Sequence, residues 1–329
     1  MINNWLYYKK NIDVNLIKFI ESFPDESSCR IKFKEFRDEQ GVICKKCGST
    51  DHYWLQTIEQ YQCKKCKTRT TLRSGTVMQA SNLPFRYWFI AIHLLTSTKK
   101  TFSAKELQRQ IGHKFYEPIW FMMQKLRITM GSRDRNYKLD KIVELDEGFF
   151  ESVDTEKDEQ ENDAPRKRGR GSQKQRKVLV MASTVHNFNK TKKYGKPTKF
   201  RFVRMIVVDN LKGQTIEEKV NENIEFDAVI KTDDYSSYSK LKDHVWCHIP
   251  QKVSPREAGN VLPWVHTMIS NAKRTLLGIH HMISNKYSQN YLDEFCYKVN
   301  RRNYGEQIFD RLLIACVTSN YQNIVKHYR

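Results

Sequence analysis

Four cysteines in two closely spaced pairs have the clearest chemical spacing in this sequence. Cys44 and Cys47 form one Cys-x-x-Cys pair and Cys63 and Cys66 form the other, with fifteen residues between the pairs. Two such pairs can hold one tetrahedral Zn2+, and four thiolates leave no open position for a substrate. Two short β-prone runs lie between them, so residues 41–72 are predicted to form a zinc ribbon with a structural metal.

Two aspartates are candidates for a different metal chemistry. Asp146 lies inside an otherwise apolar run, and Asp233 follows the short apolar run 228–232. A charge at such a place is costly unless it is paired or binds a metal. Carboxylates at the edges of adjacent strands suit Mg2+ or Mn2+, which can activate a water or a 3′-hydroxyl for attack on a phosphodiester. Other acidic residues compete for this role: Glu144, Glu147, Asp209, Asp227 and Asp234.

The elements before residue 136 are predicted to be mainly helical, apart from the ribbon. Residues 1–40 form a helical lead-in, and residues 73–135 form a second helical segment. In this segment one helix begins at the cap Ser103 and ends at Gly112, and the next follows Pro118. Their spacing is that of a helix-turn-helix, for which Lys125 and Arg127 are candidate DNA contacts. A plain helical bundle, with the apolar stripes as its core, remains the alternative.

The elements from 136 to 305 alternate between strands and helices, which predicts an α/β domain with a mixed sheet and flanking helices. Three successive strands come first, then a helix, two short strands and two final helices. They are expected at residues 141–150, 178–185, 200–208, 215–220, 228–232, 244–249, 263–277 and 290–302. Residues 306–329 are left as a C-terminal tail.

The composition points to a polyanionic partner. The net charge is +20 and the pI is about 9.5, which favours binding to nucleic acid. The loop 154–177 is acidic and then basic, and its basic half is a candidate phosphate contact or only a solvated surface. The basic candidates there are Arg166, Lys167, Arg168 and Arg170. We expect no membrane segment and no secretory signal, and scattered remaining cysteines indicate a reducing compartment: the cytoplasm, or the nucleus in a eukaryotic host.

Several motifs in a fixed order resemble one family of proteins. They are the cysteine ribbon, the helical segment, Val-Glu-Leu-Asp-Glu-Gly-Phe-Phe, Arg-Gly-Arg-Gly-Ser, Lys-Thr-Asp-Asp-Tyr-Ser-Ser-Tyr, His-Thr-Met-Ile-Ser-Asn-Ala-Lys-Arg and Tyr-Leu-Asp-Glu-Phe-Cys-Tyr-Lys-Val-Asn-Arg-Arg. Over residues 15–305 the chain resembles the zinc-ribbon insertion-sequence transposases of the ISXO2-like family, relatives of Merlin elements. The resemblance implies an RNase H-like catalytic core, binding to terminal inverted repeats and target DNA, and Mg2+- or Mn2+-dependent strand cleavage and transfer. By analogy it also implies a homo-oligomer on DNA.

The same resemblance implies roles for individual residues. Asp146 and Asp233 correspond to the first two catalytic aspartates, and Asn271 stands at the third position, where many members have Glu. Lys273 matches an Asn–Lys variant and is expected to hold a phosphate, although both residues could simply face solvent. His266 is either a residue that orients water or phosphate, or a packed histidine.

Two other functions remain compatible with the sequence. A domesticated transposase would bind a specific DNA sequence without cutting it, and a general nuclease would cut DNA without needing terminal repeats. Metal-dependent cleavage separates the binding protein from the two enzymes, and a need for terminal repeats separates the transposase from the nuclease.

Overall fold

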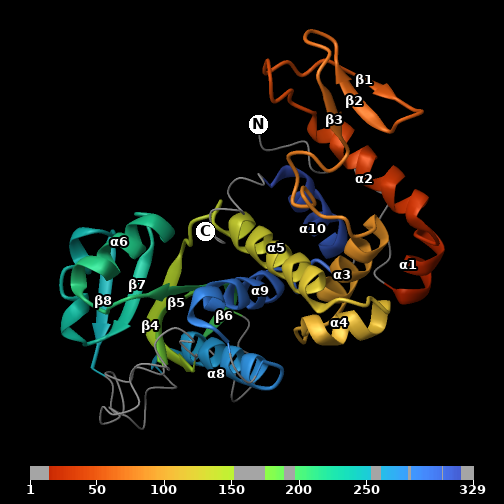
Figure 1. Ribbon diagram of the computed structural model, residues 1–329. Helices are drawn as coiled ribbons and strands as arrows, with labels where there is room; N and C mark the ends of the chain where they lie inside the picture. The colour runs from red at the N-terminus through yellow and green to blue at the C-terminus, as the bar shows by residue number, and fades with distance from the viewer. Residues whose placement is uncertain are drawn as a thin grey trace, which may run out of the picture. The chain divides into compact units, whose positions relative to one another are not determined.

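The computed structural model describes residues 15–151, 175–188, 197–252, 261–280, 283–305 and 307–319. The chain divides into two compact units (Figure 1). The terminal unit comprises Met1–Arg133 and Arg301–Arg329, and the central unit comprises Asp134–Asn300. Among the described residues, no helix is both long and apolar enough to cross a membrane.

The terminal unit contains a small sheet and several helices. The helices are α1 (Leu16–Ser22), α2 (Glu26–Gln40), α3 (Phe85–Ser97), α4 (Ala104–Ile111), α5 (Tyr116–Asp134, whose last residue belongs to the central unit) and α10 (Gln307–Thr318). The strands are β1 (His52–Leu55), β2 (Gln60–Cys63) and β3 (Arg69–Thr71), which pair antiparallel in the order β1-β2-β3. The predicted lead-in helices and ribbon strands are therefore present.

Local sequence signals set the ends of several of these helices. The Asp25 carboxylate accepts the Ser28 N–H at 2.8 Å and begins α2, as expected of an N-cap. Ser103 begins α4 in the same way, accepting the Glu106 N–H at 3.0 Å. Gly112 ends α4 with φ of 67°, a left-handed conformation that favours glycine. Both predicted boundaries of α4 are confirmed.

The C-terminal residues differ from the expected tail, because residues 307–318 form the helix α10. This helix contacts α2 and α3. Its Phe309 lies 5.7 Å from Phe23 and 5.9 Å from Phe89 between ring centroids. The tail prediction failed because α10 is a short apolar helix whose partners lie more than two hundred residues earlier in the chain.

The central unit is built on a mixed five-stranded sheet in the order β6-β5-β4-β7-β8. Its strands are β4 (Ile142–Glu151), β5 (Gln175–His186), β6 (Thr198–Val208), β7 (Val229–Asp233) and β8 (Cys247–Gln251). The first three strands are antiparallel neighbours, and β7 and β8 run parallel to β4. This order and these directions are those of an RNase H-like core, as predicted.

Helices cover both faces of this sheet (Figure 1). They are α6 (Gly213–Asn223), α8 (Pro263–Leu277) and α9 (Ser288–Arg301, whose last residue belongs to the terminal unit), with short 3-10 turns η2 (Ser236–Tyr238), η3 (Leu241–Asp243) and η4 (Asn285–Tyr287). One core packs α8 and α9 against Phe150, and the other packs α6, η2 and η3 against Leu145. Alternate side chains of β4 therefore face different helices.

Candidate functional site

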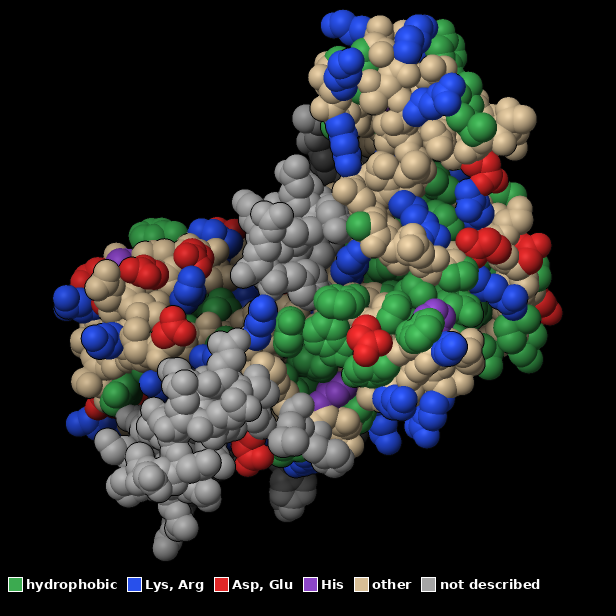
Figure 2. Space-filling view, in the orientation of Figure 1, with side chains coloured by type: hydrophobic (Ala, Val, Ile, Leu, Met, Phe, Trp, Pro, Cys, Tyr) green, Lys and Arg blue, Asp and Glu red, His purple; other side chains and the backbone are tan. Residues whose placement is uncertain are grey.

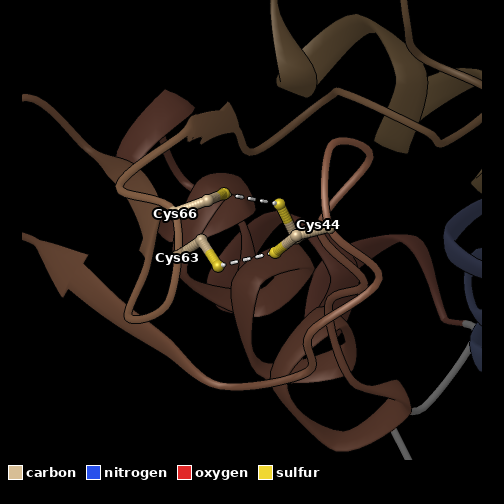
Figure 3. A group of neighbouring side chains, drawn as sticks. Cys44, Cys63 and Cys66 are labelled. Carbon is tan, nitrogen blue, oxygen red and sulfur yellow. Dashed lines mark hydrogen bonds between the residues drawn. The ribbon is translucent and has the colours of Figure 1, made fainter.

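The four cysteines of the ribbon converge on one point (Figure 3). The Sγ atoms of Cys44 and Cys66 are 3.4 Å apart, those of Cys47 and Cys63 are 3.5 Å apart, and all four lie within 4.8 Å of one another. Four sulfurs about 2.3 Å from a tetrahedral Zn2+ lie roughly 3.8 Å from each other. The donor set and its spacing fit a structural zinc site.

Two matching turns create this convergence. The Cys44 carbonyl accepts the Gly48 N–H at 2.9 Å, and the Cys63 carbonyl accepts the Lys67 N–H at 3.0 Å. Gly48 and Lys67, each four residues after a cysteine, both have positive φ. The Cys66 thiol lies 3.2 Å from the Thr68 hydroxyl oxygen, to which it donates, and hydrogen bonding with Thr68 lowers the pKa of this thiol to about 6. Cys66 therefore favours the thiolate, the form that binds metal, whereas at Cys47 the Ser49 N–H is outweighed by the neighbouring cysteine sulfurs, which raise the pKa of that thiol to about 12.

The two predicted aspartates lie on neighbouring parallel strands. The last ladder pair between β4 and β7 is Glu144–Lys231. Asp146 and Asp233 each lie two residues beyond this pair, and a step of two returns to the same face of a sheet. On the other face, Val143 and Ile230 share a core. Asp146 and Asp233 are thus level with one another on the face that α8 covers.

Glu144 anchors α8 over this face. Its buried carboxylate accepts the N–H of Trp264 at 2.7 Å and that of Val265 at 3.0 Å, at the start of the helix. A carboxylate at a helix N-terminus satisfies unpaired donors and complements the helix dipole. Glu144 is thereby a structural residue, which removes one competitor for the catalytic role.

Further along, His266 and Lys273 of α8 lie beside Asp146 and Phe150 of β4. His266 Nδ1 lies 3.5 Å from Asp146 Oδ2, with side chains that are 34% and 15% exposed. Lys273 follows His266 by seven residues, two helical turns, so the two side chains differ by only about 20° around the axis. The Lys273 Nζ lies 5.8 Å from the ring centroid of Phe150 on β4. Asp146, His266 and Lys273 therefore line one side of α8.

Asn271 lies elsewhere on the same helix. It is exposed and lies five residues after His266, which corresponds to about 140° around the axis. Trp264, seven residues before Asn271, shares its side of the helix. The Trp264 Nε1 donates to the Thr198 carbonyl of β6 at 3.0 Å. The structure thus places Asn271 on the side of α8 toward β6, away from Asp146, and places His266 where the sequence analysis had expected Asn271.

Further polar groups surround the two aspartates. Asp233 Oδ1 accepts the Tyr235 N–H at 3.3 Å. Gln251 of β8 pairs in register with Asp233, and its Oε1 is buried without a hydrogen-bond partner among the described residues. On the opposite face of β4, Glu147 accepts a 2.8 Å hydrogen bond from the Tyr238 hydroxyl. No sequence signal singled out Gln251, and Tyr238 is noted only as the last residue of the motif Lys-Thr-Asp-Asp-Tyr-Ser-Ser-Tyr, without a role.

The remaining acidic competitors differ from this pair in their surroundings. Asp209, Asp227 and Asp234 are exposed. An exposed carboxylate is hydrated and needs no metal to offset its charge. Their exposure leaves Asp146 and Asp233 as the better candidates.

The predicted DNA contacts Lys125 and Arg127 require a correction. The Lys125 side chain is 9% exposed and donates to the Gln79 carbonyl at 2.8 Å. Arg127 is 0% exposed and donates to the Phe102 carbonyl at 3.2 Å. Burial lowers the pKa of Lys125 to about 8. Both side chains satisfy backbone carbonyls inside the unit and cannot reach DNA from it, so this prediction was wrong.

Exposed basic side chains are instead gathered on the ribbon turns (Figure 2). They are Lys45, Lys46, Lys64, Lys65, Lys67 and Arg69. The other predicted contacts, Arg166, Lys167, Arg168 and Arg170, lie outside the described residues. A groove of about 540 Å³ in the terminal unit is lined in part by Arg37, Lys45 and Gly75, and the described residues that line it include no carboxylate.

Comparison with known families and structures adds an independent result. A model described as an ISXO2-like transposase domain matches residues 138–300, and one described as a transposase zinc-ribbon domain matches residues 24–69. Together they match more than half of the chain. No curated protein matches the sequence significantly.

Two solved structures are similar over much of their length. The Mos1 transposase paired-end complex with left transposon end is 12% identical, with 74% of this chain and 82% of that chain covered and a TM-score of 0.28. The pre-cleavage Mos1 transpososome is 10% identical, with 91% and 99% covered and a TM-score of 0.27. These TM-scores are too low to support an argument about this chain.

Proposed function

The chain belongs to the ISXO2-like family of zinc-ribbon transposases, and from that premise we propose that it cuts and joins DNA at the ends of an insertion sequence. The proposed substrate is double-stranded DNA with terminal inverted repeats, together with a target DNA. The proposed reaction is Mg2+- or Mn2+-dependent phosphodiester cleavage followed by strand transfer.

The observation that carries this proposal is the placement of Asp146 and Asp233 at the same level on neighbouring parallel strands, with a histidine beside Asp146. Asp146 on β4 and Asp233 on β7 face the same helix, and His266 of that helix lies beside Asp146. Two carboxylates that leave positions for water and phosphate oxygens are a suitable donor set for Mg2+ or Mn2+. A divalent cation bound there would supply Lewis-acid activation of the attacking oxygen and stabilise the leaving oxygen.

The residues of the chain have separate roles in this proposal. Asp146 and Asp233 supply the negative charge that holds the cation against a phosphate. His266, beside Asp146, accepts a proton from the attacking hydroxyl. Lys273, on the same side of α8, offers its ammonium to a phosphate oxygen next to the reacting bond. Asn271 has no role in this assignment.

DNA recognition is assigned to the terminal unit. Lysines on both ribbon turns, among them Lys46, Lys64 and Lys65, are exposed next to the cysteines that would hold the structural zinc. Phosphate contacts of this kind position a protein on DNA and make binding depend on salt. We further propose a homo-oligomer that brings two transposon ends together, acting in the bacterial cytoplasm or, in a eukaryote, in the nucleus.

The decisive experiment is an end-cleavage assay with zinc-loaded protein. The substrate is a DNA duplex that carries the sequences flanking this gene, incubated with Mg2+ or Mn2+. Asp146→Ala and Asp233→Ala are expected to slow nicking by at least about a thousandfold, since each removes a metal ligand. The exposed Asp227 is the control, and Asp227→Ala should keep the wild-type rate.

Each alternative outcome has a clear meaning. Full cleavage by the two aspartate variants would refute the site. Specific binding without any metal-dependent cleavage by the wild type would indicate a domesticated DNA-binding protein. Cleavage that does not depend on terminal repeats would indicate a general nuclease.

A further inference from the structure

A buried hydrogen bond lies directly behind the proposed metal site. The Tyr238 hydroxyl donates to Glu147 Oε1 at 2.8 Å. Tyr238 is 1% exposed and Glu147 is 9% exposed. Glu147 follows Asp146 in β4, and Tyr238 lies five residues after Asp233. The bond therefore joins the two segments that carry the proposed metal ligands.

The backbone does not tie these segments together at the level of the aspartates. The ladder between β4 and β7 ends at the pair Glu144–Lys231 among the described residues. Beyond it, β7 continues to pair only on its other side, as far as Asp233 with Gln251 of β8. The separation of Asp146 from Asp233 must therefore depend on side-chain contacts.

The chain between Asp233 and Tyr238 is short and internally bonded. The Asp233 carboxylate accepts the Tyr235 N–H, and the Tyr235 carbonyl accepts the Tyr238 N–H at 3.0 Å. Tyr238 is further held in a core with Leu145 and Ile230. Any movement of the Tyr238 ring is thus transmitted to Asp233 through a few bonded residues.

We propose that Tyr238 and Glu147 are positioning residues, whose hydrogen bond sets the separation of Asp146 and Asp233 and thereby the affinity for a divalent cation. The proposal rests on the function proposed above, because it assumes a cation at those aspartates. Burial, and then the charge of Glu147, raise the pKa of Tyr238 well above its usual range. The hydroxyl therefore keeps its proton and remains a donor at neutral pH.

The test measures Mn2+ binding directly, by electron paramagnetic resonance of free Mn2+ during titration of the zinc-loaded protein. The site is defined as the binding that Asp146→Ala removes. Tyr238→Phe deletes only the hydroxyl and is expected to weaken Mn2+ binding by about tenfold, as is typical when a partner of a metal ligand is lost. The concentration of Mg2+ needed for half-maximal nicking should rise by the same factor, while the rate at saturating Mg2+ changes little.

Two further variants serve as controls. One tests whether loss of any buried tyrosine hydrogen bond weakens Mn2+ binding, and the other tests whether loss of a negative charge does. Tyr61 is a second buried tyrosine whose hydroxyl donates to a carboxylate, that of Asp38 at 2.6 Å in the terminal unit. Tyr61→Phe removes a similar bond and should leave Mn2+ affinity unchanged. Glu147→Gln keeps an oxygen that can accept from Tyr238 and removes only the charge, so it should retain most of the affinity.

The outcomes are distinct. Unchanged Mn2+ affinity in Tyr238→Phe would overturn the positioning role, and so would a loss in Glu147→Gln as large as in Tyr238→Phe, because charge would then explain the effect. Equal Mn2+ binding by wild type and Asp146→Ala would reject the metal site and the positioning role together. A wild type that binds Mn2+ at this site but does not nick DNA would reject only the proposed function.

Discussion

The two candidate metal centres of this protein are assembled in opposite ways. The ribbon centre takes all its donors from two short turns within residues 44–66, and its four sulfurs are already within 4.8 Å of one another. The acidic centre takes Asp146, Asp233 and His266 from two strands and a helix that are spread over 121 residues of sequence. The first is closed by its ligands, and the second is partly exposed to solvent.

This difference matches the chemistry of each centre. Four thiolates complete a tetrahedral shell, so the metal can only stabilise the fold. Partly exposed carboxylates leave coordination positions for water and for a phosphate, which is what catalysis needs. In a centre made of local turns, the metal itself mainly holds the ligands in place. In a centre built on a sheet, the packing of strands and helices holds them in place.

Loss of the ribbon metal is the largest expected effect. Binding of a structural Zn2+ contributes on the order of 10 kcal/mol to the fold of a small domain. Cys63→Ser, or chelation of zinc, should therefore unfold the ribbon and abolish DNA binding while the central unit keeps its Mn2+ site. Zinc content, circular dichroism and gel-shift titration measure these changes.

The control for this experiment is Cys247→Ser, which changes a cysteine of β8 outside the cluster. It should keep its zinc and its DNA affinity. Retention of DNA affinity by zinc-free protein would break the comparison, because the ribbon would then not need its metal.

Substitution of His266 or Asn271, the two candidates for the third catalytic position, is expected to have the next largest effect. His266→Ala should reduce end cleavage by about a hundredfold, since it removes a group beside Asp146. Asn271→Ala, on the other side of α8, should change the rate less than about threefold, the effect typical of an exposed residue. Single-turnover nicking at saturating Mg2+ measures both rates.

The two variants form a matched pair on one helix. A severe loss in Asn271→Ala with a mild loss in His266→Ala would restore the assignment made from sequence. It would also require α8 to rotate when DNA binds.

The smallest predicted effect is a change in the free energy of unfolding when a carboxylate with a raised pKa is replaced by an amide. Burial raises the pKa of Asp310 to about 6, and its Oδ1 has no hydrogen-bond partner among the described residues. The folded state therefore binds this proton more tightly than the unfolded state, and stability falls as the pH rises from about 4 through 6. Asp310→Asn should be more stable than wild type at pH 7.5, and this gain should exceed the gain at pH 5 by about 1 kcal/mol.

Asp293 is the matched residue of the central unit. Burial raises its pKa to about 6 as well, but Arg135 lies 3.4 Å away and Gln289 donates to it at 2.8 Å. Asp293→Asn should show a similar rise in relative stability from pH 5 to pH 7.5, because its pKa is raised to the same value, but loss of the contact with Arg135 should make it less favourable than Asp310→Asn at both pH values. Denaturant unfolding at the two pH values measures both variants, and an Asp293→Asn as favourable as Asp310→Asn would remove this contrast between the units.

Local signals in the sequence correctly predicted many helices and strands, but they did not predict which side chains are buried and which are exposed. The cap Ser103, the terminator Gly112 and the helix Pro263–Leu277 follow from backbone preferences of single residues, and the structure confirms them. Lys125 and Arg127 were expected on a surface because charged residues are usually exposed. Their burial depends on backbone carbonyls supplied by Gln79 and Phe102, which no local pattern reveals.

The sequence by itself determined the zinc ribbon and most of the order of strands and helices, because these depend on spacing and periodicity along the chain, and the resemblance to a family selected Asp146 and Asp233 from several acidic candidates. Only the tertiary structure decided that α10 joins the terminal unit and that His266, rather than Asn271, lies beside Asp146. Those outcomes depend on which side of a helix packs against which strand, and that packing is set by contacts between segments far apart in the sequence.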